Sequence, residues 1–379
     1  MSARLDQHLV VPFDYPVIFT DHVFSPDNAA LHTALLRLGE PRPPRAMLYV
    51  DANADAATPG LASTAAAWCR KWAVTLAAPP SILPGGELAK NDWPATHALI
   101  GEMLALRLDR HAFVIIAGGG ALLDAVGFAA SLVHRGLRVI RVPTTALAQC
   151  DGAVGIKTAV NFAGGKNAIG TFAPPFAVLN DFQFLPTLAP RDWRGGIAEA
   201  FKVAIIRDRP FFDFLCEHTS AFRERRPAPM RHLVQRCAEL HLQHIRTGGD
   251  PFEMGRARPL DFGHWSAHKL ELLSGFRISH GDAVAAGIAL DSAYAALHGW
   301  LRDDDFLRIH RALAQSGFPL WYDEMEDPRL LDGLRDFQEH LGGALCITFP
   351  SGLGNRREES QVAHETIQAA LHRLKQLAP

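Results

Sequence analysis

The sequence predicts an α/β amino-terminal domain with a doubly wound, mostly parallel sheet, followed by an all-α domain. In the first half, short apolar segments alternate with helical patterns, the order expected of a Rossmann-like sheet with helices on both faces. After about residue 181 the strand signals fade and amphipathic helical periodicity dominates. We therefore expect two domains, residues 1–183 and 184–379.

β-branched runs such as 114–116 favour strands, whereas apolar residues three and four positions apart favour helices. The predicted strands are residues 46–50, 73–77, 113–117, 137–142 and 176–179, and the helices between them are 61–72, 93–108 and 122–133. In the second half we expect helices at 231–247, 263–273, 282–299 and 358–377. The ligand crevice of such a sheet lies at the carboxyl ends of its strands.

Composition excludes several classes of partner. The chain has 379 residues, 48% of them hydrophobic, and a formal net charge of -2, which gives no general attraction to nucleic acid or anionic membranes. Segment 112–133 is long and nearly uncharged, but three glycines and Asp124 favour a strand, turn and helix over a membrane span. Five scattered cysteines and an amino terminus without a leader pattern favour a cytoplasmic protein.

A glycine turn follows one predicted strand. Gly118, Gly119 and Gly120 lead into a helix, where backbone N–H groups can approach a pyrophosphate. The triplet is not G-x-G-x-x-G, and tight packing would explain it equally well. Asp51 stands at another strand end, where a carboxylate can bind a ribose hydroxyl.

Lysines are fewer than arginines in this chain, so their positions are informative. Lys157, Lys166 and Lys202 lie in apolar or glycine-rich surroundings, which suggests phosphate or carboxylate binding, with a surface position as the alternative. Glu87 and Lys90 offer a further pair after another strand, for which a solvated loop is the alternative.

Histidines in the second half suggest a metal site. His264 and His268 lie one helical turn apart, and His280 opens the next predicted helix. Two imidazoles and one carboxylate form a catalytic divalent-metal site with open positions, and Glu199 is the natural third ligand. A purely structural histidine pair is the alternative.

Six segments of the chain occur in the order seen in 3-dehydroquinate synthase and its relatives, the sugar phosphate cyclases. They are GGGALLDAVGF, HRGLRVIRVPTTALAQCDGAVGIKTAVN, GGKNAIGTF, IAEAFKVAII, LDFGHWSAHKLE and HGDAVAAGI, and the resemblance covers residues 84–293. It implies an NAD-binding α/β domain, a helical metal domain and a homodimer. The fifth segment also resembles a divergent branch from bacterial Ebo gene clusters.

The resemblance implies a role for each matching residue. The metal ligands would be Glu199, His264 and His280, with zinc or cobalt as the ion. NAD would contact Asp51, Glu87, Lys90, Gly118, Gly119, Gly120, Asp124, Thr144, Thr145, Lys157, Lys166 and the segment from Phe184 to Thr187. Substrate and catalytic groups would be Asp151, Lys157, Asn167, Lys202, Asp261 and His268, with Arg135 reaching across the dimer. In the family, NAD oxidises a hydroxyl, phosphate leaves, the hydride returns and the ring closes by an aldol step.

Departures from the family bear on the substrate. Gln243 and Ala257 replace the lysine and arginine that hold a substrate carboxylate, and Asp261 replaces an asparagine. Arg256 or Arg258 could compensate. The family's phosphate-site lysine falls near His340, and Leu123 replaces a glycine before the turn aspartate.

The expected partner is a phosphorylated seven-carbon sugar or keto acid, such as sedoheptulose 7-phosphate or the heptulosonate of the shikimate route. Because the carboxylate-binding residues are missing, we expect preference for the sugar without a carboxylate. Two alternatives remain, a metal-dependent polyol or alcohol dehydrogenase of related fold and a catalytically silent relative.

Overall fold

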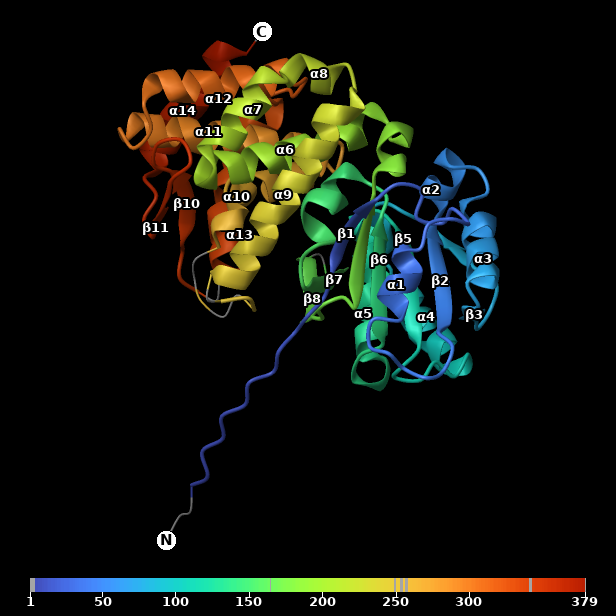
Figure 1. Cartoon of the computed structure of the whole chain (residues 1–379). Coiled ribbons are helices and arrows are strands. Elements are labelled where there is room, and N and C mark those ends of the chain that lie inside the picture. Colours follow the sequence, from blue (N-terminus) through green and yellow to red (C-terminus); the bar gives the residue numbers. More distant parts are fainter. Residues whose placement is uncertain are drawn as a thin grey trace.

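The computed structural model describes residues 4–163, 165–248, 250–252, 255, 258–340 and 343–378. Figure 1 shows two lobes, one built on a sheet and one built almost entirely of helices, with the amino-terminal segment before the first strand extending away from both. The predicted division of the chain after residue 183 stays a prediction.

The first lobe contains a seven-stranded sheet in the order β1-β9-β6-β5-β2-β3, with β4 also pairing β2. Its strands are β1 (Val17–Thr20), β2 (Arg45–Asp51), β3 (Thr75–Leu76), β4 (Ser81–Leu83), β5 (Phe113–Gly118), β6 (Arg138–Pro143) and β9 (Ala177–Asp181). Every strand pair in it is parallel, so the predicted parallel sheet is confirmed. The short strands β1 and β4 were not predicted.

Helices cover both faces of this sheet. They are α1 (Ala30–Leu35), α2 (Ala52–Ala57), α3 (Leu61–Lys71), α4 (Trp93–Ala105) and α5 (Gly120–Leu132), with the 3-10 helices η1 (Glu87–Lys90) and η2 (Val133–Arg135). Alternate residues of β2 serve two separate cores: Leu48 packs in the core that contains Trp68 of α3, and Tyr49 packs in the core that contains Met103 of α4. This division follows from the two-residue period of a strand buried on both faces.

A separate two-stranded antiparallel hairpin consists of β7 (Lys157–Phe162) and β8 (Gly165–Phe172), preceded by the π-helix η3 (Ala148–Gly152). The hairpin packs on α5 through a small core of Ala125, Phe128 and Val160. The hairpin, which carries Lys157 and Lys166, lies on the side of the first lobe that faces the second lobe (Figure 1).

The second lobe is helical around one large core. It contains η4 (Phe182–Thr187), α6 (Pro190–Arg207), α7 (Arg209–Glu217), α8 (Thr219–Arg223), α9 (Pro227–Thr247), η5 (Pro259–Asp261), α10 (His264–Leu273), α11 (His280–Leu297), α12 (Asp303–Gln315), η6 (Asp323–Glu326), η7 (Pro328–Leu331), α13 (Asp332–His340) and α14 (His364–Leu377). Helix α11 is buried from Gly281 to Ala295, because most residues on every side of it are apolar; Asp282, Asp291 and Ser292 are the buried polar residues within it. No helix in the described part of the chain combines the length and the apolar character needed to cross a bilayer.

One segment differs from the prediction of a helix over 358–377. A hairpin of β10 (Ile347–Pro350) and β11 (Arg356–Glu359) comes first, and α14 begins only at His364. In β11, Arg356 pairs with Glu358 and Arg357 pairs with Glu359, each two residues apart. Such pairs fit the two-residue period of a strand and not the spacing of a helix face.

Candidate active site

The carboxyl ends of the central strands bring together the residues predicted to bind a dinucleotide. Asp51 is the last residue of β2 and is buried; it caps α2 by accepting from the Asn53 N–H at 2.8 Å, and its Oδ2 lies 3.5 Å from the Gly119 nitrogen after β5. A Cβ atom at Gly85 would lie 2.2 Å from the Asp51 carboxylate oxygens, and one at Gly119 would lie 3.2 Å from the Thr145 side chain. Backbone therefore approaches this edge closely, and a ligand can reach main-chain N–H groups.

A buried ion pair lies beside that edge. Lys90 on η1 is 4% exposed, and its Nζ donates to Asp124 Oδ2 at 2.7 Å and to Asn167 Oδ1. Burial raises the pKa of Asp124, while the Lys90 cation acts to lower it. This arrangement joins η1, α5 and the β7–β8 hairpin, so three predicted site residues from distant parts of the chain meet.

The remaining residues predicted to contact the cofactor lie on neighbouring segments. Thr144 continues β6 and donates its N–H to the Gly118 carbonyl at 3.0 Å. On η4, the Thr187 hydroxyl donates to the Phe184 carbonyl at 2.7 Å, while the Phe184 ring is buried in the core under the sheet. The Phe184 side chain thus has a packing role.

Three helices present the predicted metal ligands. Glu199 lies in the middle of α6 and is 1% exposed, while His264 and His280 are the first residues of α10 and α11. Glu199 Oε1 lies 3.9 Å from His264 Nε2 and 3.8 Å from His280 Nε2. Among the described residues Glu199 Oε1 is buried without a hydrogen-bond partner. A divalent ion about 2.0–2.2 Å from each ligand atom fits these separations and would satisfy that oxygen.

Close backbone contacts hold the ligands together. A Cβ atom at Gly281 would lie 2.5 Å from the Gly195 Cα, so α11 and α6 touch one residue from His280. Ser279 begins α11 by accepting from the Asp282 N–H at 3.3 Å. Gly263, with φ 79°, starts α10 in the left-handed conformation that glycine adopts without strain.

Electrostatics favour neutral imidazoles at this site. Burial lowers the pKa of His264 well below its ordinary value, and the nearby Lys202 and His280 lower it further. Burial likewise lowers the pKa of His268, whose ring centroid lies 5.4 Å from that of His264. Both rings are therefore neutral at neutral pH, which a metal ligand or a general base requires.

Lys202 is enclosed by carboxylates. Its Nζ pairs with Glu199 Oε2 and lies 3.2 Å from Asp151 Oδ2. Burial would lower the pKa of Lys202, but Glu199 and Asp151 outweigh it and raise the pKa above its ordinary value. Burial opposes ionisation of Asp151, yet His241 and Lys202 hold its pKa well below the usual range. Lys202 and Asp151 are thus both charged at neutral pH.

Sequence reasoning missed three residues of this region. Glu271 on α10 bonds Lys166 and His280; seven residues separate it from His264, and that helical spacing could have indicated it. His241 lies 3.4 Å from Asp151, and no sequence signal pointed to it. Asp291 accepts from the Trp265 indole and the Gly263 N–H, which anchors the start of α10.

Several predictions concern residues at the rim. Asp261 on η5 is close enough to Lys202 to raise its pKa. Arg135 is exposed on η2, away from the metal ligands in the sequence and in the fold. Arg256 and Ala257 lie outside the described residues.

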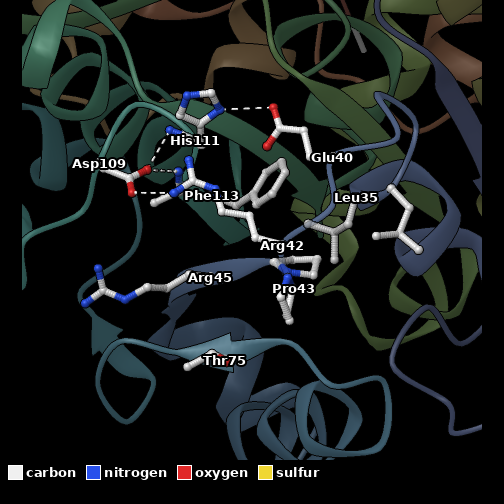
Figure 2. Close-up of a pocket in the computed structure, with 12 residues that line it drawn as sticks. Leu35, Glu40, Arg42, Pro43, Arg45, Thr75, Asp109, His111 and Phe113 are labelled. Atoms are coloured by element: carbon white, nitrogen blue, oxygen red, sulfur yellow. Dashed lines mark hydrogen bonds and ion pairs between the residues drawn. The ribbon is translucent and has the colours of Figure 1, made fainter.

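A cavity of about 240 Å³ lies elsewhere, at the amino ends of β2 and β5. Figure 2 shows that its charged residues bond one another, Glu40 to His111 and Arg42 to Asp109. Because these charges are already paired, and because the cavity is on the opposite edge of the sheet, it is separate from the site described above.

The fold and the site define a two-lobed protein with a glycine-rich strand edge in one lobe and a cluster of possible metal ligands in the other. Family models for the 3-dehydroquinate synthase N-terminal and C-terminal regions match residues 81–195 and 196–336. A 3-dehydroquinate synthase from Laribacter hongkongensis (strain HLHK9) is 35% identical over 291 residues, which cover 76% of this chain and 80% of that protein. The chain therefore belongs to the 3-dehydroquinate synthase family, and the prediction of the family is confirmed.

Solved structures agree in fold. A 2-epi-5-epi-valiolone synthase from Streptomyces hygroscopicus subsp. jinggangensis 5008, with NAD+ and Zn2+ bound, is 28% identical with a TM-score of 0.89; the match covers 98% of this chain and 100% of that one. A 2-deoxy-scyllo-inosose synthase complexed with carbaglucose-6-phosphate, NAD+ and Co2+ is 23% identical with a TM-score of 0.77, over 94% of this chain and 96% of that one. The second likeness shows the shared fold.

Proposed function

We propose that the chain is a sugar phosphate cyclase of the 3-dehydroquinate synthase type, a phosphate-eliminating lyase that uses NAD and a divalent metal, zinc or cobalt. The observation that carries this proposal is the buried Glu199 Oε1, which lies 3.9 Å from His264 Nε2 and 3.8 Å from His280 Nε2 and has no hydrogen-bond partner among the described residues. The bound NAD+ and Zn2+ of the valiolone synthase, and membership of the family, support the same cofactors.

The residues divide the work in this proposal. Glu199, His264 and His280 would hold the divalent ion, which would polarise an oxygen of the substrate, and bound NAD would supply reversible hydride transfer. The Lys202 ammonium, fixed between carboxylates, presents a positive charge to anionic oxygen of the substrate. Neutral His268 can accept a proton beside the metal ligands.

The β7–β8 hairpin and the nearby edge of the sheet would bind the phosphate groups. Lys157 begins β7, Asn167 lies on β8, and both stand on the strand pair that faces the helical lobe (Figure 1). Asp51, the glycine turn, Thr144 and Thr145 hold the dinucleotide at the sheet edge. A sugar phosphate would then lie between the two lobes, within reach of both groups.

The proposal includes a cytoplasmic homodimer. His134 and Arg135 have successive positive φ angles of 51° and 66°, an unfavourable conformation for residues other than glycine. This strained turn keeps the exposed Arg135 side chain on the surface, where it can reach a partner's phosphate site. Cys69 and Cys150 are buried as free thiols, which agrees with a reducing compartment.

The substrate is a seven-carbon sugar phosphate, and we propose preference for a ketose such as sedoheptulose 7-phosphate over the heptulosonate. Asp261 places a carboxylate near Lys202, and the Gln243 side chain supplies no positive charge. A second substrate carboxylate would meet repulsion there and lack a cation.

One experiment tests the function. Metal-loaded protein is incubated with NAD and either sugar phosphate, and released phosphate, product mass and NADH absorbance are followed. We expect phosphate release and a cyclic product without accumulating NADH, because the hydride returns before product leaves. A higher kcat/KM for the heptulosonate would instead assign the activity of 3-dehydroquinate synthase.

The same assay addresses the two alternatives. Steady, stoichiometric NADH formation would identify a polyol or alcohol dehydrogenase. Failure to bind NAD or metal would identify a silent relative.

A further inference from the structure

Glu271 is a charged residue that neither the family ligand set nor the cofactor assignment uses. It lies on α10, is 3% exposed, and both of its oxygens accept from Lys166 Nζ at 2.9 Å. Its Oε2 also lies 3.1 Å from His280 Nδ1. A buried carboxylate thus joins a lysine of β8 in one lobe to a metal-ligand histidine in the other.

The hydrogen bond fixes the chemistry of His280. If Nδ1–H donates to Glu271, the Nε2 lone pair is free and points at the side where Glu199 Oε1 lies 3.8 Å away. His264 is held in the same manner, because its Nδ1 lies 3.1 Å from the Phe262 carbonyl. Each imidazole therefore has a fixed acceptor behind the nitrogen that faces the metal site.

The same geometry contains a competing set of ligands. His268, Glu271 and His280 offer atoms within 4.8 Å of one another, as Glu199, His264 and His280 do, and the two sets share His280. Lys166 pairs with both oxygens of Glu271, so an ion can reach that buried carboxylate only by displacing the ammonium of the partly buried Lys166. Lys166 thus disfavours the second set.

We propose that Glu271 is a positioning residue that orients His280 for the metal, and that Lys166 keeps Glu271 in that role and out of the coordination sphere. The inference rests on the proposed metal site and extends it. Lys166, which was expected to contact the cofactor, then links the cofactor-binding lobe to the metal ligands.

The first test measures metal binding without turnover. Cobalt affinity of the apo protein is determined by chelator competition, together with the visible Co2+ spectrum, for the wild type, Glu271→Gln and Glu271→Ala. We expect Glu271→Ala to lose about 10–100-fold in affinity and to change the spectrum, and Glu271→Gln to keep most of the affinity because its amide oxygen still accepts from His280. Asp336→Asn, which removes the Lys269 pair from the same helix, is the control and should bind as the wild type does.

A second test examines the choice between ligand sets. In the wild type, His268→Ala should leave cobalt affinity within about threefold, whereas in a Lys166→Met background the same change should lower it about tenfold. Melting temperature of the apo proteins and NAD affinity report whether each variant is folded.

The outcomes separate this inference from the proposed function. Wild-type affinity and spectrum in a folded Glu271→Ala variant would overturn the positioning role while leaving the metal site intact. Equal sensitivity to His268→Ala in both backgrounds would overturn the role of Lys166. A wild-type protein that binds no cobalt would contradict the proposed function itself, and this inference with it.

Discussion

The two lobes assemble their parts of the site in different ways. The sheet lobe uses strand ends, where Asp51 and the glycines of residues 118–120 meet because parallel strands finish at one edge. The helical lobe uses burial, since Glu199 and Lys202 sit inside a helix that is otherwise packed in the core. In the first lobe topology gathers the polar groups, whereas in the second each charge must be compensated by a neighbour.

This difference teaches where each half is vulnerable. The N–H groups of Gly119 and Gly120 at the strand edge are uncharged and belong to half-buried residues, whereas a buried charge left alone costs several kcal/mol. We therefore expect changes in the helical lobe to affect both stability and metal binding, and changes at the sheet edge to affect mainly cofactor binding.

The largest effect is expected from His264→Ala. Loss of this ligand should remove the bound ion and lower turnover by about 1000-fold or more, since a metal supplies several kcal/mol of charge stabilisation. NAD affinity should be largely kept, because the residues proposed to bind the cofactor lie mainly in the other lobe. Elemental analysis and NAD titration measure the two effects, and a full metal complement in this variant would remove His264 from the ligand list.

Lys202→Met tests the compensation of buried charge. Glu199 and Asp151 would be left without their shared cation, so we expect the apo protein to lose about 3–5 kcal/mol in free energy of unfolding. Lys269→Met, which removes a pair with the exposed Asp336, should cost about 0–1 kcal/mol. Urea unfolding compares them; equal losses would mean that the Lys202 pair contributes no more than a surface one.

Two glycine substitutions should show whether each lobe controls the binding of its own ligand. In Gly85→Ala the new methyl group would displace the Asp51 carboxylate, and in Gly281→Ala it would push α11 from Gly195. Gly85→Ala should lower the affinity for NAD, and Gly281→Ala should lower the affinity for cobalt. We expect a loss of about 5–150-fold in each case, which corresponds to about 1–3 kcal/mol. Gly101→Ala is the control, because its new methyl group would have no atom within 4 Å beyond its own stretch of helix backbone. If both ligands weakened equally in each variant, the lobes would not be independent.

The smallest effect concerns pH. Burial, followed by the Arg207 cation, lowers the pKa of His244 to about 4 from an ordinary value of 6.5. The unfolded chain then binds more protons between these values, so this contribution to stability is present above about pH 6.5 and is lost as pH falls toward about 4. His244→Gln should make the free energy of unfolding less dependent on pH. The measurement is the free energy of unfolding of the variant and of the wild type at pH 4.5 and at pH 7. A difference independent of pH would contradict the assignment.

Much of the fold was predictable because its signals are local. Continuous apolar runs predicted the buried strands, and three successive glycines predicted the turn after one of them. The four-residue spacing of His264 and His268 predicted that their side chains lie on one face of a helix. The Lys166–Glu271 pair was not, since 105 residues separate its members and only the packing of the two lobes brings them together. The short strands β1 and β4 gain their hydrogen bonds from neighbours, so their own sequences carry little signal.

The glycine contact between α6 and α11 has a consequence for protein engineering. Because Gly195 and Gly281 bring two backbones together, a main-chain contact helps to set the spacing of Glu199 and His280. Libraries that vary buried neighbours such as Ile197 and Val284 while keeping both glycines should therefore repack the core around α6 and α11 and retain the ion. The core of this lobe can then be redesigned for stability without rebuilding the proposed metal site.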